Sequence, residues 1–591
     1  MPTTERLPKT GSIARLRLLQ TTDLHMQILP FDYERLRPLS DSGLTHLAPH
    51  IARLRNEGVP SILVDTGDFL QGNALADHAI AAPGIHPMIA AFNKMHYDAI
   101  VLGNHDFDYG IRPLRRVLKD LKCPVLAANI AVSDHRQLAL PSTIVPVTTE
   151  LGVIQVGLFG VTVTPSSTVR NPQVPPFLEV SNIQEKATAA VTDLKRDGAD
   201  IIVALCHFGI DPTDRLDNIA DRIAQIAGVD ALFAAHTHDA FPGPDIPEAQ
   251  GIDPKTGRLH GVPAVMGSAF GRAIGQIDLT LRSDPDGWHV TKAVCDLVRP
   301  PATSAPPPLP FPELLSLHDA TLKSLREPVA QTSVPLSTTF SMIAPDHSQF
   351  LLANARIAWV RRQLAGSQHE NVPLIGTAAP YQAGTKDAPA LFLNVLPGNI
   401  TMQDVQGIFP FRDPVIGLVQ KGADIRAWLE RSAERFLQIA PGQTRQPLID
   451  PCFAPYDFKS FFGLDYQFDV SQPSGKRVVA LSYQGQNLQP NDTFVVATTP
   501  KHQSGRDLSN TSEVLCLSKI TSQEILKDYL RANGTITQPF VPNWGFAPLS
   551  KTQAQFITSS DADLALTTAA VTPGPLVGEG LQRFNLSFDS R

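Results

Sequence analysis

Residues 99–108 read Ala-Ile-Val-Leu-Gly-Asn-His-Asp-Phe-Asp, an apolar run that changes at Gly103 into a string of polar residues. A run of apolar, β-branched residues predicts a strand that is buried on both faces. Gly103 lets the backbone turn sharply after this strand, so the Asn104 amide oxygen can bind a metal and His105 can face a substrate. The stretch therefore predicts an α/β sheet with functional residues at the carboxyl end of a strand.

Four other short motifs follow apolar runs in the same way. They are, in chain order, Asp23 and His25, Gly67 and Asp68, His207, and His236 and His238. Metal-assisted phosphoester hydrolysis needs oxygen and imidazole ligands around two cations roughly 3.5–4 Å apart. Each motif alone is a weak signal, because an isolated Asp-x-His is more often a surface turn and a single histidine more often a core or surface residue. Together and in this order, the motifs predict a dinuclear metal site.

The composition bounds the class of protein. A chain of 591 residues is too long for one hydrophobic core, and we expect two large domains. The net charge of -7 argues against a nucleic-acid polymer or an anionic membrane as partner. The five cysteines include no C-x-x-C pair, so we expect no disulfide framework. Residues 1–11 are polar with two prolines, and no run approaches the roughly 20 apolar residues of a membrane span, so we expect a cytoplasmic protein.

The pattern along the chain places a boundary near residue 300. Between residues 13 and 298, apolar strands at 61–65, 99–102, 154–159, 201–205 and 231–234 alternate with helical stretches such as 183–196 and 216–227. Prolines crowd residues 299–312, and a helix is expected at 312–326, so 299–330 form a connector. A second, α+β domain follows at 331–585, with a helix at 423–436 and strands at 466–470, 478–483 and 494–498. Residues 567–591 are too irregular to assign.

The order Asp-x-His, Gly-Asp, Gly-Asn-His-Asp, His and His-x-His resembles the calcineurin-like metallophosphoesterase superfamily. Within it the chain is most similar to the 5′-nucleotidase family, and especially to the 2′,3′-cyclic-nucleotide 2′-phosphodiesterase/3′-nucleotidases. The similarity covers nearly the whole chain and includes Gln20–His25, Ser42–Thr45, Gly103–Gly110, Gly261–Met266, Trp428–Ala433 and Phe494–Thr498. It implies a four-layer αββα metallophosphoesterase domain followed by an α+β substrate-binding domain.

The resemblance also implies a role for each motif residue. One metal would be held by Asp23, His25 and His238 and the other by Asn104, His207 and His236, with Asp68 bridging the two. His105 would be the catalytic histidine that binds no metal, oriented by Asp108. The implied reaction is hydrolysis of a nucleotide by a hydroxide that bridges two divalent ions, and this donor set suits Zn, Mn, Fe or Co.

The second domain departs from the family pattern. Family members stack the nucleoside between two aromatic rings and hold phosphate with an arginine near Gly-Gly-Arg, whereas here Lys386 supplies a point charge. Phe411 retains one ring, although core packing is an equally good interpretation of Phe409 and Phe411. The other strand end, residues 499–505, has no aromatic residue, and Lys501 and His502 there either face the substrate or lie in a solvated loop. Losing one face of a base sandwich removes stacking of about 1–3 kcal/mol.

Two alternatives therefore remain open. The enzyme would act on a non-nucleoside or sugar-nucleotide phosphate ester, or the chain would be a catalytically degenerate protein that only binds a ligand. The complete set of predicted metal ligands argues against the second alternative. The small-molecule partner is expected to be a phosphate ester, and the oligomeric state stays open. Family members are usually periplasmic or exported, so the expectation is either that this member stays inside the cell or that a leader was removed and Met1 is artificial.

Overall fold

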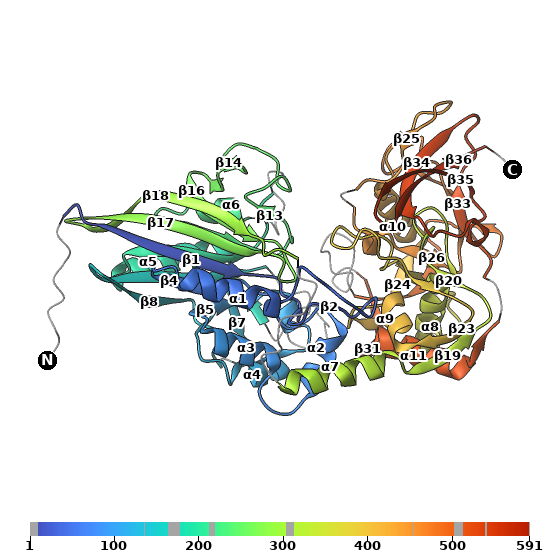
Figure 1. Cartoon of the computed structure of the whole chain (residues 1–591). Helices are drawn as coiled ribbons and strands as arrows, with labels where there is room; N and C mark the ends of the chain where they lie inside the picture. Colours follow the sequence, from blue (N-terminus) through green and yellow to red (C-terminus); the bar gives the residue numbers. More distant parts are fainter. Residues whose placement is uncertain are drawn as a thin grey trace. The chain divides into compact units, whose positions relative to one another are not determined.

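The computed structural model describes residues 10–134, 136–163, 178–211, 219–302, 312–451, 453–500, 512–537 and 540–589. These residues form two compact units, which divide within helix α7 (Pro312–Leu325) between Leu322 and Lys323. We call them the N-terminal unit and the C-terminal unit (Figure 1).

The first sheet of the N-terminal unit has six strands in the order β18-β17-β1-β4-β5-β6. Strands β1, β4, β5 and β6 run parallel, whereas β17 and β18 pair antiparallel at one edge. The strands are β1 (Ile13–Thr21), β4 (Ser61–Asp65), β5 (Ala99–Val101), β6 (Val125–Leu126), β17 (Ile274–Asp284) and β18 (Gly287–Val298).

The second sheet follows the order β14-β15-β16-β12-β11-β9-β8, with β13 paired to β16. Its central strands β9, β11, β12 and β16 are parallel. The strands are β8 (Ser142–Thr149), β9 (Gly152–Thr162), β11 (Ile201–His207), β12 (Ala231–Ala234), β13 (Ala240–Phe241), β14 (Ile252–Asp253), β15 (Arg258–Leu259) and β16 (Val262–Gly267).

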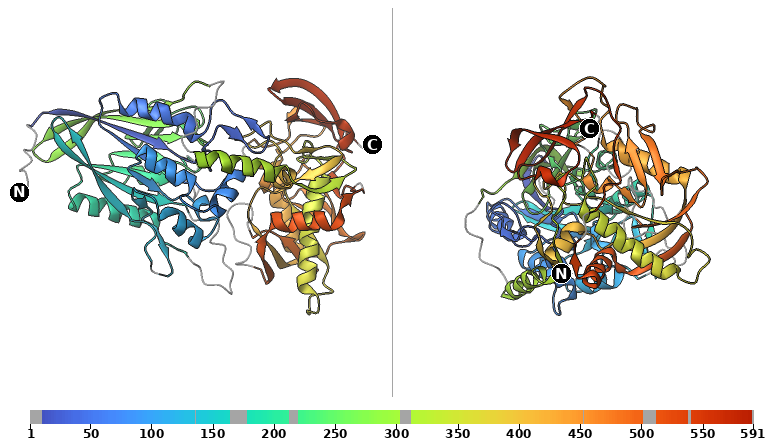
Figure 2. Two further views of the ribbon diagram at one scale, coloured as in Figure 1. Left: turned by 60° about the horizontal axis from the view of Figure 1, so that its bottom comes forward. Right: turned by 90° about the vertical axis from the view of Figure 1, so that its right-hand side faces the viewer.

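These two sheets pack face to face, with helices outside. Leu16 and Leu18 on one face of β1 join Val156 and Leu158 of β9 in a single buried cluster. Arg17 points the other way and donates from Nη1 to the Leu54 carbonyl of α1 (Leu44–Arg55), so α1 covers the outer face of the first sheet. Helices α5 (Ile183–Arg196) and α6 (Ala220–Ala224) cover the second sheet (Figures 1 and 2). The predicted αββα layering is confirmed.

Shorter elements fill the loops of the N-terminal unit. They are β2 (Phe31–Asp32), β3 (Arg37–Pro38), α2 (Ala74–Ala81), α3 (Pro87–Met95), the 3-10 helix η1 (His105–Phe107), α4 (Ile111–Leu118), β7 (Ile130–Val132) and β10 (Leu178–Val180).

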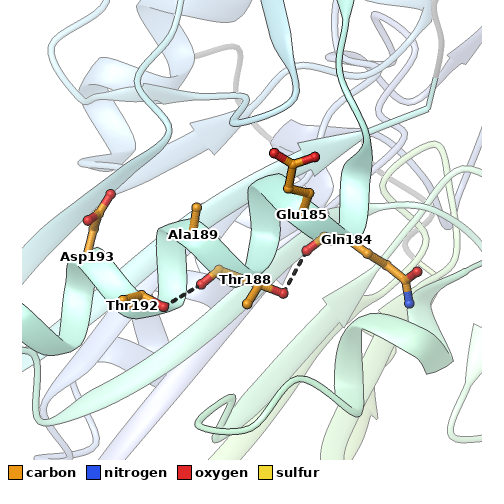
Figure 3. Close-up of a pocket in the computed structure, with 6 residues that line it drawn as sticks. All are labelled: Gln184, Glu185, Thr188, Ala189, Thr192 and Asp193. Carbon is orange, nitrogen blue, oxygen red and sulfur yellow. Dashed lines mark hydrogen bonds between the residues drawn. The ribbon is translucent and has the colours of Figure 1, made fainter.

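Helix α5 shows how amphipathic sequence places a helix on the sheet. Ala187, Val191 and Leu194 are buried against the strands. The opposite side borders a hollow of about 510 Å³, lined by Gln184, Glu185, Thr188, Ala189, Thr192 and Asp193 (Figure 3). Its two threonine hydroxyls donate back to helix carbonyls, Thr188 to Gln184 and Thr192 to Thr188. All the residues that line this hollow belong to the outer side of α5, and none of them is a predicted site residue.

A five-stranded sheet in the order β26-β21-β30-β24-β31 forms the centre of the C-terminal unit. Alternate residues of β30 face different cores, because Phe494 and Val496 pack with Trp428 of α10 whereas Val495 and Ala497 pack with α8 and α11. The elements are α8 (His347–Leu364), β21 (Leu374–Ala378), β24 (Pro414–Lys421), α10 (Gly422–Ser432), β26 (Ser460–Phe462), β30 (Thr493–Thr498), β31 (Val514–Thr521) and α11 (Ser522–Asn533).

Smaller sheets surround this centre. A three-stranded sheet joins β23 (Gly398–Thr401), β19 (Pro328–Thr332) and β32 (Thr535–Ile536), and β20 (Leu336–Ser337) pairs with β22 (Asn394–Val395). Two four-stranded sheets contain β29 (Gln486–Asn487), β28 (Val478–Tyr483), β27 (Asp465–Phe468) and β33 (Trp544–Phe546), and β25 (Gln446–Pro447), β34 (Gln553–Ser559), β36 (Leu581–Ser587) and β35 (Ala570–Gly578). The remaining helices within the described part of the C-terminal unit are α9 (Met402–Ile408), η3 (Ala433–Arg435), η4 (Pro455–Asp457) and η7 (Leu564–Leu566).

Two expectations for local structure need correction, and one segment left unassigned has a regular structure. The helix expected at 423–436 ends at Ser432 and continues only as the 3-10 turn η3. The helix expected at 216–227 is limited to α6 in the described part, and residues 212–218 lie outside it. Residues 570–587 form the antiparallel pair β35 and β36, and the sequence left them unassigned because Pro573 and Pro575 interrupt the alternation of β35. No helix among the described residues is long and apolar enough to cross a bilayer.

Candidate metal centre

The carboxyl ends of parallel strands bring the predicted ligands together. Asp23 and His25 follow β1, Asp68 follows β4, and Asn104 follows β5 in the first sheet. In the second sheet His207 is the last residue of β11, and His236 and His238 follow β12. Since the two sheets pack face to face, the five strand ends converge on one site.

Asp23, His25 and His238 form the first group of ligand atoms. One potential ligand atom from each lies within 4.8 Å of the others. The Nε2 atoms of His25 and His238 are 3.0 Å apart, and Nε2 of His238 is 3.7 Å from Oδ1 of Asp23. Asp23 and His25 are buried, whereas His238 is half-buried.

Asp68, His207 and His236 form the second group under the same 4.8 Å limit. His207 Nε2 lies 3.1 Å from Oδ2 of Asp68 and 3.1 Å from Oδ1 of Asn104. The same Asp68 oxygen is 3.9 Å from His25 Nε2, so this carboxylate lies between the two groups. A carboxylate in this position is able to contribute to both metal sites.

Hydrogen bonds orient the imidazoles for metal binding. Nδ1 of His25 lies 2.7 Å from the Gln71 carbonyl, and Nδ1 of His207 lies 2.7 Å from the Thr66 carbonyl. Because a carbonyl only accepts, each Nδ1 carries a hydrogen, and each Nε2 is the ring nitrogen that faces the site. Nδ1 of His236 is buried and has no hydrogen-bond partner among the described residues. These nitrogen and oxygen donors fit a pair of divalent transition-metal ions.

The backbone is strained at the ligands. Asp23, His25, Asp68, His236 and His238 all have φ between 45° and 77°, in the left-handed region that residues other than glycine rarely adopt. Such conformations cost on the order of 1 kcal/mol or more each and cluster at functional sites. The ligand loops also touch closely, since a Cβ on Gly67 would lie 2.5 Å from the Gly103 nitrogen.

Burial and neighbouring charges set the protonation of the ligands. Burial lowers the pKa of His25 and of His236 to about 3, which keeps both imidazoles neutral at pH 7. Burial also opposes a charge on His207, but the adjacent Asp68 carboxylate raises the pKa of His207 to about 10. Burial raises the pKa of Asp68, but His207 and His105 outweigh it, and the net pKa lies well below the usual range. Metal binding would therefore displace a proton from His207.

His105 lies beside the two groups without belonging to either. Its ring centroid is 5.5 Å from that of His25, and its backbone N–H donates to Oδ1 of Asp68 at 2.7 Å. Nδ1 of His105 lies 2.7 Å from Oδ2 of Asp108, so this carboxylate engages Nδ1 of the ring. Both side chains are about one-fifth exposed, so solvent or a substrate has access to the pair.

Sequence reasoning missed Phe270, which also lines the site. Its ring centroid is 5.5 Å from His25 and 5.2 Å from His238, and its backbone N–H donates to the Asp23 carbonyl. The guanidinium carbon of Arg272 lies 5.1 Å from the same ring. The available signal was its place just after β16, since this strand is parallel to β12 and ends at the same edge.

The C-terminal unit gathers aromatic rings around Phe411. The Phe411 centroid is 5.4 Å from Tyr381, 6.1 Å from Phe409 and 6.1 Å from Tyr456. Phe409 is fully buried, as its core-packing interpretation expects, whereas Phe411 is half-buried and Tyr456 is exposed. Sequence reasoning missed Tyr381 and Tyr456, because neither belongs to a motif.

Of the three predicted cationic or polar substrate contacts, only Lys386 lies among the described residues. Lys386 is exposed in the segment between β21 and β22. Lys501 and His502 lie outside the described residues.

Two protein-family models match the chain. The calcineurin-like phosphoesterase model matches residues 16–240, which include every predicted metal ligand. The model of the 5′-nucleotidase C-terminal domain matches residues 330–511, which include the Phe411 rings.

Individual relatives extend over most of the chain. The 2′,3′-cyclic-nucleotide 2′-phosphodiesterase/3′-nucleotidase of Salmonella typhimurium is 29% identical over 576 residues, which are 90% of this chain and 89% of that protein. The trifunctional nucleotide phosphoesterase YfkN of Bacillus subtilis is 27% identical over 97% of this chain, which spans only 42% of YfkN. A candidate 5′-nucleotidase of Staphylococcus aureus, solved with α-ketoglutarate, superposes with a TM-score of 0.72 over 90% of this chain and all of that one. At 21% identity, that structure demonstrates the shared fold alone.

Proposed function

Because this chain is a metallophosphoesterase of the 5′-nucleotidase family, we propose that it hydrolyses nucleotides as a 2′,3′-cyclic-nucleotide phosphodiesterase and 3′-nucleotidase. The observation that carries the proposal is the convergence of two ligand groups at strand ends, with the Asp68 carboxylate between them. The enzymes named for this activity among the relatives support the choice of nucleotide.

In this proposal Asp23, His25 and His238 would hold one divalent ion, and Asn104, His207 and His236 would hold a second. Asp68 would contribute to both sites. Two divalent ions, when bound, supply Lewis acidity toward the phosphoryl oxygens and toward water. The neutral imidazoles of His25 and His236 and the unpaired Nδ1 of His236 support this ligand set.

His105 and Asp108 act on the proton that the leaving ribose oxygen requires. Asp108 accepts the Nδ1 hydrogen of His105, which fixes the tautomer and stabilises the imidazolium form. Nε2 of His105 then holds a proton at the edge of the site, where it stabilises developing charge or protonates the ribose oxygen.

The remaining assignments concern domains and substrate contacts. We assign residues 13–298 to the metal domain, 299–330 to the connector and 331–585 to the substrate domain. In the substrate domain Phe411 stacks on the base, a role that its half-buried ring and its aromatic neighbours support. Lys386, Lys501 and His502 are assigned to the polar part of the substrate.

A substrate screen of the purified full-length chain tests the proposal. With Mn²⁺ or Zn²⁺ added, we expect faster phosphate release from 2′,3′-cyclic and 3′-nucleotides than from 5′-nucleotides, p-nitrophenyl phosphate or sugar phosphates. Preference for a non-nucleoside ester would replace the proposed substrate class. A chain that binds two metal equivalents but cleaves no ester would instead be a ligand-binding protein.

A further inference from the structure

Asp106 is a fully buried carboxylate that accepts four backbone hydrogen bonds. Its Oδ1 accepts from the N–H groups of Phe69 and Leu70, both at 3.0 Å. Its Oδ2 accepts from Asp68 at 3.0 Å and from Gly103 at 2.8 Å. Every acceptor direction of this side chain is thus directed at backbone, and none at the metal groups.

The four donors belong to two loops that carry proposed functional residues. Asp68, Phe69 and Leu70 lie in the loop after β4, whereas Gly103 opens the loop after β5 that contains Asn104 and His105. Strands β4 and β5 are neighbours in parallel register, with Asp65 opposite Ile100. One side chain therefore joins the loop of the proposed bridging ligand to the loop of a second ligand and the catalytic histidine.

The two loops approach each other closely and the backbone at Asp68 is strained. Hydrogen bonds between Asp106 and both loops therefore stabilise this arrangement. Asp68 has φ of 57°, and a Cβ on Gly103 would lie 2.2 Å from Oδ1 of Asp68. The His105 N–H donates to that same oxygen at 2.7 Å. Without partners for the N–H groups of residues 68–70, the left-handed turn at Asp68 would leave buried donors unsatisfied.

We propose that Asp106 is a positioning residue that sets the placement of Asp68 between the two metal groups. The inference rests on the proposed metal centre, but Asp106 itself binds no metal and touches no substrate. Its carboxylate holds the left-handed Asp68 turn and the Gly103 loop in one arrangement. Partners one shell beyond the ligands commonly change metal affinity 10- to 100-fold when they are replaced.

The chain offers a matched control in Asp65, a second fully buried carboxylate at the end of β4. Among the described residues it accepts from the Gly67 N–H and from the Thr21 hydroxyl, and the Thr21 hydroxyl also contacts the Tyr97 hydroxyl, where either group can donate. In Asp65→Asn, the amide oxygen keeps the Gly67 bond and the NH₂ donates to Thr21. In Asp106→Asn, the NH₂ group instead faces backbone N–H donors. Because an amide NH₂ does not accept hydrogen bonds, those bonds are lost.

Mn²⁺ binding to the full-length chain tests the proposal. We expect wild type and Asp65→Asn to bind two equivalents with similar affinity by titration calorimetry and to give the spectrum of a spin-coupled pair in electron paramagnetic resonance. Asp106→Asn should bind the second equivalent more than tenfold more weakly and give the signal of isolated Mn²⁺. A folded Asp106→Asn protein with wild-type affinity and a coupled spectrum would overturn the proposal.

Hydrogen exchange of the metal-free wild type provides a test without a variant. The amides of residues 68–70 and 103 should be protected, because Asp106 rather than a metal holds them. Exchange as fast as in an exposed loop would refute the positioning role even if Asp106→Asn failed to fold. Wild type that bound no Mn²⁺ but kept these amides protected would refute the proposed metal centre. It would still support the hydrogen bonds between Asp106 and the two loops.

Discussion

The ligand loops of the N-terminal unit and the Phe411 rings of the C-terminal unit are organised differently. Around the metal groups, hydrogen bonds fix individual atoms, as the Gln71 and Thr66 carbonyls do for His25 and His207. Around Phe411, rings meet edge to face at 5.4–6.1 Å. The first region selects particular donor atoms, whereas the second offers flat surfaces that several aromatic residues supply equally well. In the proposed function, reaction type and substrate preference therefore reside in separate units.

A buried arginine, Arg356, fixes the position of the C-terminal rings. Arg356 is 1% exposed, and its guanidinium carbon lies 4.8 Å from the Phe409 ring centroid. It donates from Nε to the Ser522 hydroxyl and from Nη1 to the Thr377 carbonyl. This buried cation anchors Phe409, and Phe409 in turn packs against Phe411. Packing on a hydrogen-bonded cation thus organises the C-terminal rings, whereas hydrogen bonds to the ligand side chains themselves organise the ligand loops.

The largest expected effect comes from removing Asp68. In Asp68→Ala, both metal groups lose the carboxylate between them, so we expect at most one metal equivalent and a fall in kcat of at least about 10³-fold. Elemental analysis after reconstitution measures the metal, and phosphate release measures kcat. Asp193→Ala, on the exposed side of α5, should keep both values. Two retained metals in Asp68→Ala would show that Asp68 does not bridge.

A comparable or smaller loss of kcat, without loss of metal, is expected from His105→Ala. General acid catalysis typically contributes about 10²- to 10⁴-fold, and His105 lies in neither ligand group, so kcat should fall by that amount while two metal equivalents remain. Asp108→Asn should lower kcat less, because it disturbs the tautomer and leaves the imidazole in place. If His105→Ala lost metal, the residue would be a structural part of the centre rather than its acid.

Together these two variants test the part of the site that sequence predicts best. The ligand candidates were identifiable because metal chemistry restricts residue type and because each motif follows an apolar strand, as Asp68 follows residues 61–65. The same logic predicted an α/β layered domain and the strand 231–234 at its observed bounds, whereas the αββα order of the layers was implied by the family resemblance.

Other features have no comparable signal in the sequence. Phe270 reaches the imidazoles through a left-handed backbone, and Tyr456 meets Phe411 from a separate 3-10 helix, so neither contact follows from periodicity. The strand pair β35–β36 was missed because Pro573 and Pro575 interrupt its alternation. Tertiary contacts, rather than local pattern, place all of these.

The third prediction concerns the C-terminal rings. Phe411→Ala removes a stacking surface of about 1–3 kcal/mol, so KM for a nucleotide should rise roughly 5- to 150-fold with a smaller change in kcat. Steady-state kinetics with a 3′-nucleotide measures both constants. Tyr483→Ala removes a half-buried ring elsewhere in the same unit and serves as the control. An unchanged KM would assign Phe411 to the core rather than to the substrate.

The smallest expected effect is a loss of stability of the N-terminal unit in acid, caused by His86. His86 of the N-terminal unit is 6% exposed, and neither ring nitrogen has a hydrogen-bond partner among the described residues. Burial lowers the pKa of His86 to about 3, whereas a histidine in the unfolded chain has a pKa of about 6.5. Below pH 6.5 the unfolded state therefore binds the extra proton, and the free energy of unfolding falls until the pH reaches about 3.

The size of this term follows from the same pKa difference. At pH 5.5 it amounts to about 1.4 kcal/mol relative to pH 7.5, and His86→Phe should remove it. Urea unfolding of the metal-free chain at both pH values, followed by hydrogen exchange in each unit, measures the loss. His289→Phe, which replaces an exposed histidine on β18, should keep the wild-type difference. Since the term belongs to the N-terminal unit alone, equal acid loss in His86→Phe and wild type would mean that His86 is protonated while folded.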